Sequence, residues 1–272
     1  MGGQGISHPV RRGTPPIASL ERALDLLQAV ARDAGERNVS AIAEAEGVPP
    51  ASAHRIVRTL ERSGFLAAIG RGRFTPGPAL FDLTAGRSQE VAIAAIARPE
   101  LNRLARETRQ IAHLGVLEND MVTYLVKAGA DGGRLFTREG MQLEAYCSGI
   151  GKVLLAHLPE AERDLYLDSG PFVALTANTR IDPAELKREL EQVRQTGIAV
   201  DAREVAPDLV CFAVPLRWPD GSARAAISLS TLDLPGSQLD EGAVIASLRE
   251  TAKHIEDRMF GSVRPLPPGP AR

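Results

Sequence analysis

The segment PPASAHRIVRTLERSGFLAAIGRGRFTPG, from Pro49 to Gly77, constrains the fold more than any other part of the chain. The end of this segment predicts two short strands around the turn Gly70-Arg71-Gly72. Its first half has apolar residues at the i, i+3, i+4, i+7 spacing of one helical face, namely Ala53, Ile56, Val57 and Leu60. The segment therefore predicts an amphipathic helix followed by a β-hairpin.

The other face of this predicted helix carries arginines and small polar side chains. Arginine can contact guanine and phosphate in the major groove of DNA, and hydroxyl and imidazole groups can contact phosphate. An ordinary solvated surface is the alternative for three arginines on one helix, and His54 in particular could contact DNA or have no role. The candidate DNA-binding residues are Ser52, His54, Arg55, Arg58, Thr59 and Arg62 on the helix and Arg71 and Arg73 on the hairpin.

Two shorter helical patterns precede this segment. Ser19 is the expected N-cap of the first helix, and Ser40 is the expected N-cap of a short second helix that ends at Gly47. Three helices followed by a hairpin are the element order of a winged helix-turn-helix. This order favours the DNA-binding interpretation over that of a solvated surface.

Charge and composition agree with a nucleic-acid partner for one end of the chain. The net charge is −2, but residues 1–80 hold ten arginines and seven acidic residues, whereas residues 81–272 hold 22 basic and 27 acidic residues. A basic end on an acidic body suits a polyanion that binds one domain. The sequence has no long apolar run and no secretory leader pattern, and its two cysteines form no disulfide framework, so a cytoplasmic protein is expected.

The chain is long enough for two domains, and an α+β fold class is expected. Helical patterns continue after the hairpin, where Pro99 is expected to begin a fresh helical turn and an alanine-rich face suits either a dimer contact or packing within one domain. Helices around a mixed sheet are expected beyond this point. The expected parts are a disordered tail (1–16), a winged helix-turn-helix (17–77), a helical linker (78–109), an α/β domain (110–261) and a second disordered tail (262–272).

Three stretches, in this order, are similar to the IclR family of bacterial transcriptional regulators. They are SLERALDLLQAV with VSAIAEAEGVPPASAHRIVRTLERSGFL, then AYCSGIGKVLLA, and then VDAREVAPDLVCFAVPLRWPDGSARAAISLS. The resemblance covers residues 17–261 and implies a winged helix-turn-helix, a helical linker and a GAF-like effector domain. It also implies a homodimer or dimer of dimers on palindromic double-stranded operator DNA. The implied function is repression of a catabolic operon, controlled by a small organic acid.

The resemblance further implies the residues of an effector site, which are Gly149, Ile150, Asp201, Cys211, Ser228 and Ser230. Unpaired N–H groups at the start of a helix attract an anion, and two serines two positions apart on a strand share a face. Asp201 would repel a carboxylate, so it is expected to accept a hydrogen bond from a ligand hydroxyl or a neighbouring N–H. The candidate apolar walls are Leu135, Leu143 and Phe212.

No enzyme motif competes well with this interpretation. A phosphate-binding loop requires glycine where this chain has Tyr146 and serine or threonine where it has Val153. Ser148 lies outside any G-x-S-x-G pattern. No ligand spacing joins the two cysteines to His113 or His157, so no metal and no cofactor are expected. The alternatives left open are a DNA-binding protein whose C-terminal domain only oligomerises and a small-molecule enzyme.

Overall fold

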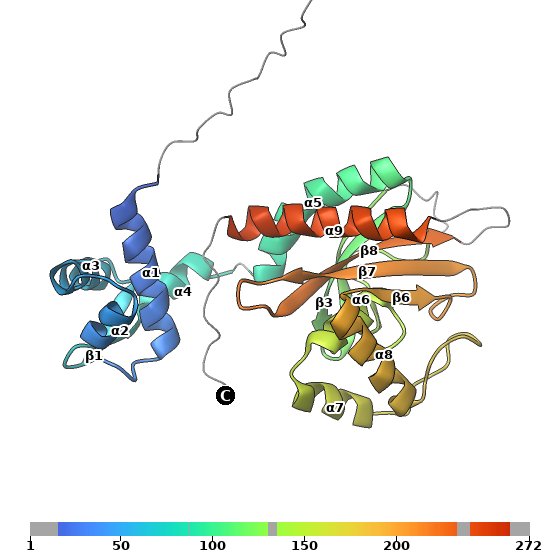
Figure 1. Cartoon of the computed structure of the whole chain (residues 1–272), viewed down its shortest axis with the longest axis horizontal. Helices are drawn as coiled ribbons and strands as arrows, with labels where there is room; N and C mark the ends of the chain where they lie inside the picture. Colours follow the sequence, from blue (N-terminus) through green and yellow to red (C-terminus); the bar gives the residue numbers. More distant parts are fainter. Residues whose placement is uncertain (1–15, 87, 130–134, 233–239, 262–272) are drawn as a thin grey trace, which may run out of the picture. The chain divides into compact units, whose positions relative to one another are not determined.

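The computed structural model describes residues 16–86, 88–129, 135–232 and 240–261. The chain divides into two compact units, Met1–Gly86 and Arg87–Arg272, and Figure 1 draws both. The expected tail 262–272, and all but one residue of the expected tail 1–16, lie outside the described residues. The expected linker contributes one helix, α4 (Pro78–Thr84), to the first unit and another, α5 (Gln89–Thr108), to the second.

The first unit has the element order of a winged helix-turn-helix, as predicted. Its core is built from apolar side chains of all three helices and the hairpin, including Leu26, Ile42, Val57 and Leu66. The two strands pair antiparallel. The elements before α4 are α1 (Ala18–Asp33), α2 (Val39–Ala45), α3 (Pro50–Arg62), β1 (Leu66–Gly70) and β2 (Arg73–Pro76).

The predicted cap of α2 is wrong by two residues. The side chain of Asn38, not Ser40, accepts a hydrogen bond from the N–H of Ala41 at 2.9 Å. Asparagine and serine are both favoured N-caps, so local sequence did not distinguish them. The choice is made by the hairpin, because the N–H of Val39 donates to the carbonyl of Gly72 at 2.8 Å and fixes where α2 begins.

Two other predicted helix boundaries are also wrong. Ile17 occupies the N-cap position of α1, which leaves Ser19 inside the first turn. Pro99 lies within the continuous helix α5 and does not begin a new one. A proline inside a helix costs about 3 kcal/mol. Packing offsets this cost, because Ile93 before the proline and Leu101 after it are buried in the same core.

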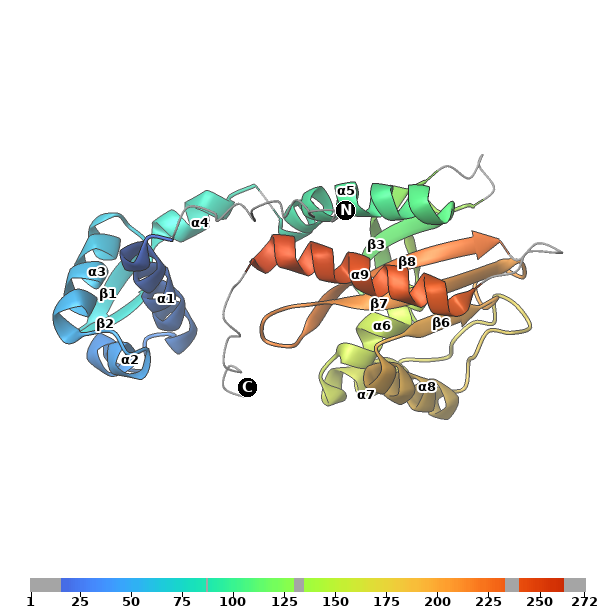
Figure 2. The same ribbon diagram turned by 45° about the horizontal axis from the view of Figure 1, so that its top comes forward.

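The second unit is built on a six-stranded sheet with the strand order β5-β4-β3-β8-β7-β6 (Figure 2). All its strand pairs are antiparallel, so the expectation of a mixed sheet is wrong. The short strands β5 and β6 were not predicted. The strands are β3 (Ile111–Glu118), β4 (Met121–Ala128), β5 (Gln142–Glu144), β6 (Ala199–Ala202), β7 (Leu209–Arg217) and β8 (Ala223–Leu232).

Helices cover both faces of this sheet (Figures 1 and 2). Helices α5 and α9 pack on one face, and α6 packs on the other with α8 beside it and α7 against α8. Helix α7 was not predicted. Within the described residues, no helix is both long and apolar enough to cross a membrane. The remaining helices are α6 (Gly149–His157), α7 (Glu160–Asp168), α8 (Pro183–Thr196) and α9 (Glu241–Phe260).

Candidate nucleic-acid interface and effector site

The predicted DNA-binding residues of α3 lie on its outer side. Ala53 and Val57 of the same helix are buried in the core, which turns the polar positions outward. Ser52 is half-buried, and the other five side chains on the helix are exposed. Arg58 pairs with Glu61 at 2.9 Å, whereas Arg55 forms no ion pair with any described residue. Arg55 can therefore meet a ligand without first breaking an ion pair, and the same holds, among the described residues, for Arg62 at the end of the helix.

A groove of about 450 Å³ runs between α1 and α3. Ser52, Arg55 and Thr59 of the predicted set line it, together with Leu20 and Ile56. The Thr59 hydroxyl donates to the backbone carbonyl of Arg55 at 2.8 Å, which leaves only its acceptor positions for a phosphate or base donor. The predicted contact residues thus form two stripes on α3, one beside α1 and one containing His54, Arg58 and Arg62.

The hairpin presents Arg71 and Arg73 as exposed side chains on the same unit. A Cβ atom on Gly70 would lie 3.2 Å from a guanidinium nitrogen of Arg73, so this side chain folds back over the strand. Arg71 lies in the turn between β1 and β2. Gly72 has a φ of +72°, a conformation that favours glycine. The turn therefore holds one arginine at its tip and one against its own strand.

In the second unit, the predicted effector residues from the sheet lie in adjacent positions on the face that packs against α6. Asp201 on β6 pairs in register with Cys211 on β7, which pairs with Ser230 on β8. The Cys211 Sγ and Ser230 Oγ atoms are 3.1 Å apart. Ser228 lies two positions from Ser230 on the same face, as predicted. Three neighbouring strands therefore bring four of the six predicted residues together.

Helix α6 places the other two predicted residues against this face. The Ser148 side chain caps the helix by accepting a hydrogen bond from the N–H of Gly151 at 3.2 Å. A Cβ atom on Gly149 would lie 3.3 Å from the Cβ of Ala213 and 3.6 Å from the carbonyl oxygen of Cys211. The absence of a side chain at Gly149 thus lets the first turn of α6, with buried Ile150, approach the sheet closely.

His113 and Thr137 extend the polar group of residues and were not among the predicted site residues. His113 is 1 % exposed and pairs in register with Ser228. Its Nδ1 atom lies 3.5 Å from Ser230 Oγ, and its Nε2 atom lies 2.9 Å from Thr137 Oγ1. A continuous line of polar groups therefore runs from Cys211 through Ser230 and His113 to Thr137. Side chains alternate between the two faces along β3. Once β3 and β8 are known to be neighbours, this alternation places His113 on the same face as Ser228.

One carboxylate oxygen of Asp201 accepts hydrogen bonds from two neighbouring backbone N–H groups. Its Oδ1 atom accepts from the N–H of Glu204 at 2.7 Å and from the N–H of Val205 at 3.3 Å. Burial raises the pKa of Asp201 to about 6, against the lowering effect of these two hydrogen bonds. The prediction that Asp201 accepts from a neighbouring N–H is therefore the alternative that the geometry favours.

The cysteines are poorly suited to nucleophilic chemistry. Burial raises the pKa of the Cys147 thiol to about 12 and raises the pKa of the Cys211 thiol well above its ordinary value. Ser230 lies between Cys211 and His113, so this thiol and imidazole form no direct pair. The Nδ1 atom of His157 donates a hydrogen bond to the carbonyl of Val153, within its own helix, at 2.8 Å. Thiolate is the reactive form of cysteine, and this environment suppresses it.

The three side chains predicted to line the effector site with apolar surface lie in three different apolar clusters. Leu135 is buried in a cluster with Cys211, at the site. Leu143 packs on the core beneath α6. Phe212 is wrong as a wall, because it is buried in the core on the α5 and α9 face. Neighbouring residues on a strand point to opposite faces, so Phe212 must face away from Cys211.

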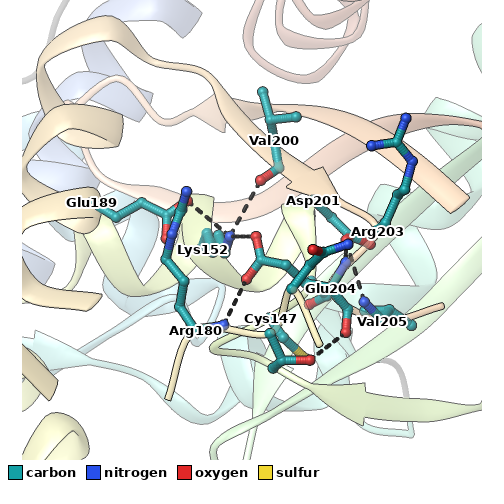
Figure 3. A network of polar contacts seen from close by, with 12 residues as sticks. Cys147, Lys152, Arg180, Glu189, Val200, Asp201, Arg203, Glu204 and Val205 are labelled. Carbon is teal, nitrogen blue, oxygen red and sulfur yellow. Dashed lines mark hydrogen bonds and ion pairs between the residues drawn. The ribbon is translucent and has the colours of Figure 1, made fainter. Parts of the chain in front are cut away.

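A buried ion-pair network beside the site was missed altogether (Figure 3). Lys152, on α6, is completely buried and pairs with Glu204 and with Glu189. Its sequence context, a lysine within an apolar helix, was the one available signal. The partners are 52 and 37 positions away along the chain, so the sequence did not identify them. Within the described ranges, no group of three or more His, Cys, Asp or Glu residues could hold a metal ion.

Two protein-family models match this chain, one within each of the two units. Residues 19–69 match the IclR helix-turn-helix domain, and residues 87–257 match the C-terminal domain of the bacterial transcriptional regulator IclR. The chain is similar to the HTH-type transcriptional regulator BhcR of Paracoccus denitrificans, with 33 % identity over 86 % of each chain. It is also similar to the transcriptional repressor IclR of Escherichia coli, with 29 % identity over 82 % of this chain and 86 % of that one.

The chain is also similar to an IclR homologue of known structure. The crystal structure of an IclR homologue from Microbacterium hydrocarbonoxydans, complexed with 4-hydroxybenzoate, matches 90 % of this chain and 100 % of that one, with 25 % identity and a TM-score of 0.58. The matched families and relatives are regulators of transcription and not enzymes. The domain matches at both ends, together with the helix-turn-helix and the sheet that carries the site, show that this chain is a member of the IclR family of bacterial transcriptional regulators.

Proposed function

We propose that this protein represses a catabolic operon by binding a palindromic operator and that a small carboxylic acid controls this binding. The observation that carries the proposal is the pairing, in one chain, of an exposed arginine-bearing helix with a buried polar site at a helix N-terminus. Repression is supported by the related Escherichia coli protein, which is named as a transcriptional repressor. Such a regulator acts in the bacterial cytoplasm, where the DNA is.

We assign the two basic elements different roles. Arg55, exposed and without a described ion-pair partner, would contact a base edge in the major groove. Arg71 and Arg73 on the hairpin would contact phosphates or the minor groove beside the helix. Assembly as a homodimer or a dimer of dimers would present two such units to the two halves of a palindrome.

The first prediction concerns Arg55. Arg55→Ala should weaken specific operator binding by about 1–3 kcal/mol and relax sequence preference at one position of each half-site. Paired removal of Arg71 and Arg73 should instead weaken binding to all sequences and flatten the salt dependence. Gel-shift titration with the promoter region beside its own gene, at several salt concentrations, measures both effects.

A matched control is available in the other unit. Arg188→Ala removes an arginine whose side chain is 74 % exposed on α8 and should leave operator affinity unchanged. Equal operator affinity for wild type, Arg55→Ala and the paired hairpin variant would contradict the assigned roles.

The effector site is best suited to an anion with further hydrogen-bonding groups. The first turn of α6 offers backbone N–H groups, and Ser228 and Ser230 offer hydroxyls beside it. A relative of known structure was crystallised with 4-hydroxybenzoate, a carboxylic acid that also carries a hydroxyl group. We infer that the effector of this chain belongs to the same chemical class of small carboxylic acids.

The second prediction is that a small carboxylate raises the melting temperature of the full-length protein. A ligand at 100 times its dissociation constant stabilises the folded state by about 2.7 kcal/mol, and each kcal/mol raises the melting temperature of a domain of this size by roughly 2–4 °C. The panel would contain acetate, pyruvate, benzoate and 4-hydroxybenzoate, with 4-hydroxybenzamide as the uncharged control. Scanning fluorimetry provides the measurement.

Substitutions can locate the response. Ser228→Ala should reduce the ligand-induced shift, whereas Ser247→Ala, on helix α9 at the other face of the sheet, should retain it. Operator binding without any thermal or DNA-binding response to the panel would favour the second interpretation, in which the C-terminal domain only oligomerises.

A further inference from the structure

Lys152 is a lysine with no solvent exposure, on the same helix that begins the effector site. Its ammonium group donates to Glu189 at 2.8 Å, to the carbonyl of Val200 at 3.2 Å, and to the carboxylate of Glu204. An ammonium group has three hydrogens to donate, so three acceptors satisfy it completely. The burial of such a charged group is very unfavourable unless it is paired and hydrogen-bonded, and here both conditions are met.

The charges of this network compensate one another. Glu204 is 1 % exposed, and Glu189 also pairs with Arg180 at 2.5 Å (Figure 3). Two cations therefore face two carboxylates. Because the positive charge of Lys152 is already neutralised by neighbours, the network is poorly suited to attract a further anion. Its geometry is better suited to holding chain segments in place.

The segment that Lys152 holds is the turn after β6, whose N–H groups donate to Asp201 at the end of that strand. The N–H of Glu204 donates to Asp201 at 2.7 Å, and the carbonyl of Glu204 accepts from the hydroxyl of Thr179 at 2.7 Å. The other carboxylate oxygen of Glu204 accepts from the N–H of Arg180 at 3.4 Å. Glu204 is therefore the centre at which α6, the turn after β6 and the segment before α8 meet.

We propose that Lys152 is a positioning residue of the effector site, which fixes the turn after β6 against the first turn of α6 through its ion pair with Glu204. The inference rests on the effector site proposed above. The first turn of α6 contains Gly149 and Ile150. The turn after β6 is hydrogen-bonded to Asp201 through the N–H groups of Glu204 and Val205. Without the ion pair, these two sides of the site lose their fixed separation, and the site is no longer preorganised for a carboxylate.

The reactivity of the two buried cysteines can show, without any effector, whether the first turn of α6 and the turn after β6 have moved apart. Cys147 immediately precedes the capped start of α6, Cys211 lies on β7 opposite Asp201, and both are buried. The test variant is Lys152→Met with Glu204→Gln, which removes both charges of this ion pair, while Glu189 keeps its pair with Arg180. N-ethylmaleimide, an uncharged thiol reagent, would be reacted with the full-length protein, and each cysteine would be followed by mass spectrometry.

We expect labelling of at least one cysteine to be about tenfold or more faster in the double variant. The matched control is Lys187→Met with Asp164→Asn, which removes an exposed lysine–aspartate pair between α8 and α7 and should label at the wild-type rate. A rate that does not change in low urea shows local opening of the site and not global unfolding. If the double variant does not fold, Glu204→Gln alone replaces it, because Lys152 then keeps Glu189.

The carboxylate panel gives a second readout. The double variant should bind the responding carboxylate about tenfold more weakly, with unchanged operator affinity in the absence of ligand. Unchanged labelling and unchanged carboxylate affinity in the double variant would overturn the positioning role. If no carboxylate binds the wild-type protein, the proposed effector is wrong, and the labelling rates alone then decide whether Lys152 holds the two segments together.

Discussion

Replacing Gly151 with alanine is expected to destabilise the second unit by at least about 3 kcal/mol, although the residue lies in a regular helix. A Cβ atom at this position would lie 2.2 Å from the carbonyl oxygen of Ala145 and 2.4 Å from its Cα. These are backbone atoms, which cannot move aside as a flexible side chain can. The gain in helix propensity from glycine to alanine is only about 1 kcal/mol, and overpacking a core costs typically 1–3 kcal/mol and sometimes more.

Urea unfolding followed by circular dichroism measures this effect. Gly242→Ala is the matched control, because it is also helical and its Cβ would meet only the Asp240 side chain, at 3.3 Å. We expect this control to unfold at the wild-type urea concentration or slightly above it. A wild-type midpoint for Gly151→Ala would show that α6 can move away from Ala145, contrary to the packing described here.

The same close packing of α6 explains why the SGIGK stretch contains two glycines. The spacing invites comparison with a phosphate-binding loop, but Gly151 is required where α6 passes the backbone of Ala145. Gly149 is required where the same helix meets β7. Both glycines therefore serve close packing of the helix, and the lysine that follows them is buried in an ion-pair network and not extended toward a ligand.

Asp201→Asn is expected to stabilise the protein at neutral pH by up to about 3 kcal/mol. Burial raises the pKa of this carboxyl group from 3.8 to about 6, so the folded state binds this proton more tightly than the unfolded state does. The contribution of protonated Asp201 to the free energy of unfolding is therefore fully present below about pH 4 and is lost as the pH rises through about 6. A difference of about two pKa units corresponds to about 3 kcal/mol. The asparagine oxygen can still accept from the N–H groups of Glu204 and Val205.

Urea unfolding of wild type and variant between pH 4 and pH 7.5 tests this expectation. The stability difference should be near zero at pH 4 and should grow through pH 6. Asp220→Asn provides a control of opposite sign, since hydrogen bonds from Ser222 lower the pKa of Asp220, whose stabilising effect is therefore present above pH 4 and lost in acid. A stability difference for Asp201→Asn that does not vary with pH would refute the pKa argument.

The same ionisation bears on effector binding. At neutral pH an ionised Asp201 disfavours a second carboxylate nearby, and its protonation below about pH 6 removes this repulsion. The carboxylate panel should therefore bind wild-type protein more tightly at pH 5.5 than at pH 7.5. In Asp201→Asn, this part of the pH dependence should disappear.

Much of the fold could be read from local sequence. The hairpin between β3 and β4 turns at Asn119 and Asp120, which have φ values of +50° and +65° in a conformation that these residue types tolerate. Asp182 caps α8 by accepting from the N–H of Glu185, and Asp240 caps α9 in the same way. These features depend on residues within a few positions of each other, so the sequence displays them directly.

Some errors were avoidable and others were not. Phe212 follows Cys211 on one strand, so simple alternation already placed it on the opposite face. Pro99 is different, because its local signal is a helix break, and only burial on both sides of it keeps α5 continuous. Strand β6 is four residues long and exists through its pairing with β7.

By itself, the sequence determined the order of the helix-turn-helix, the arginines of α3, most helix ends and the family, because these are recorded in local spacing and in short motifs. Only the tertiary structure decided which groups surround the effector site. Lys152 meets Glu189 and Glu204, and His113 meets Ser230 from 117 positions away, because sheet pairing and helix packing bring them together. Contacts across such distances depend on the whole fold, since no local preference of the chain specifies them.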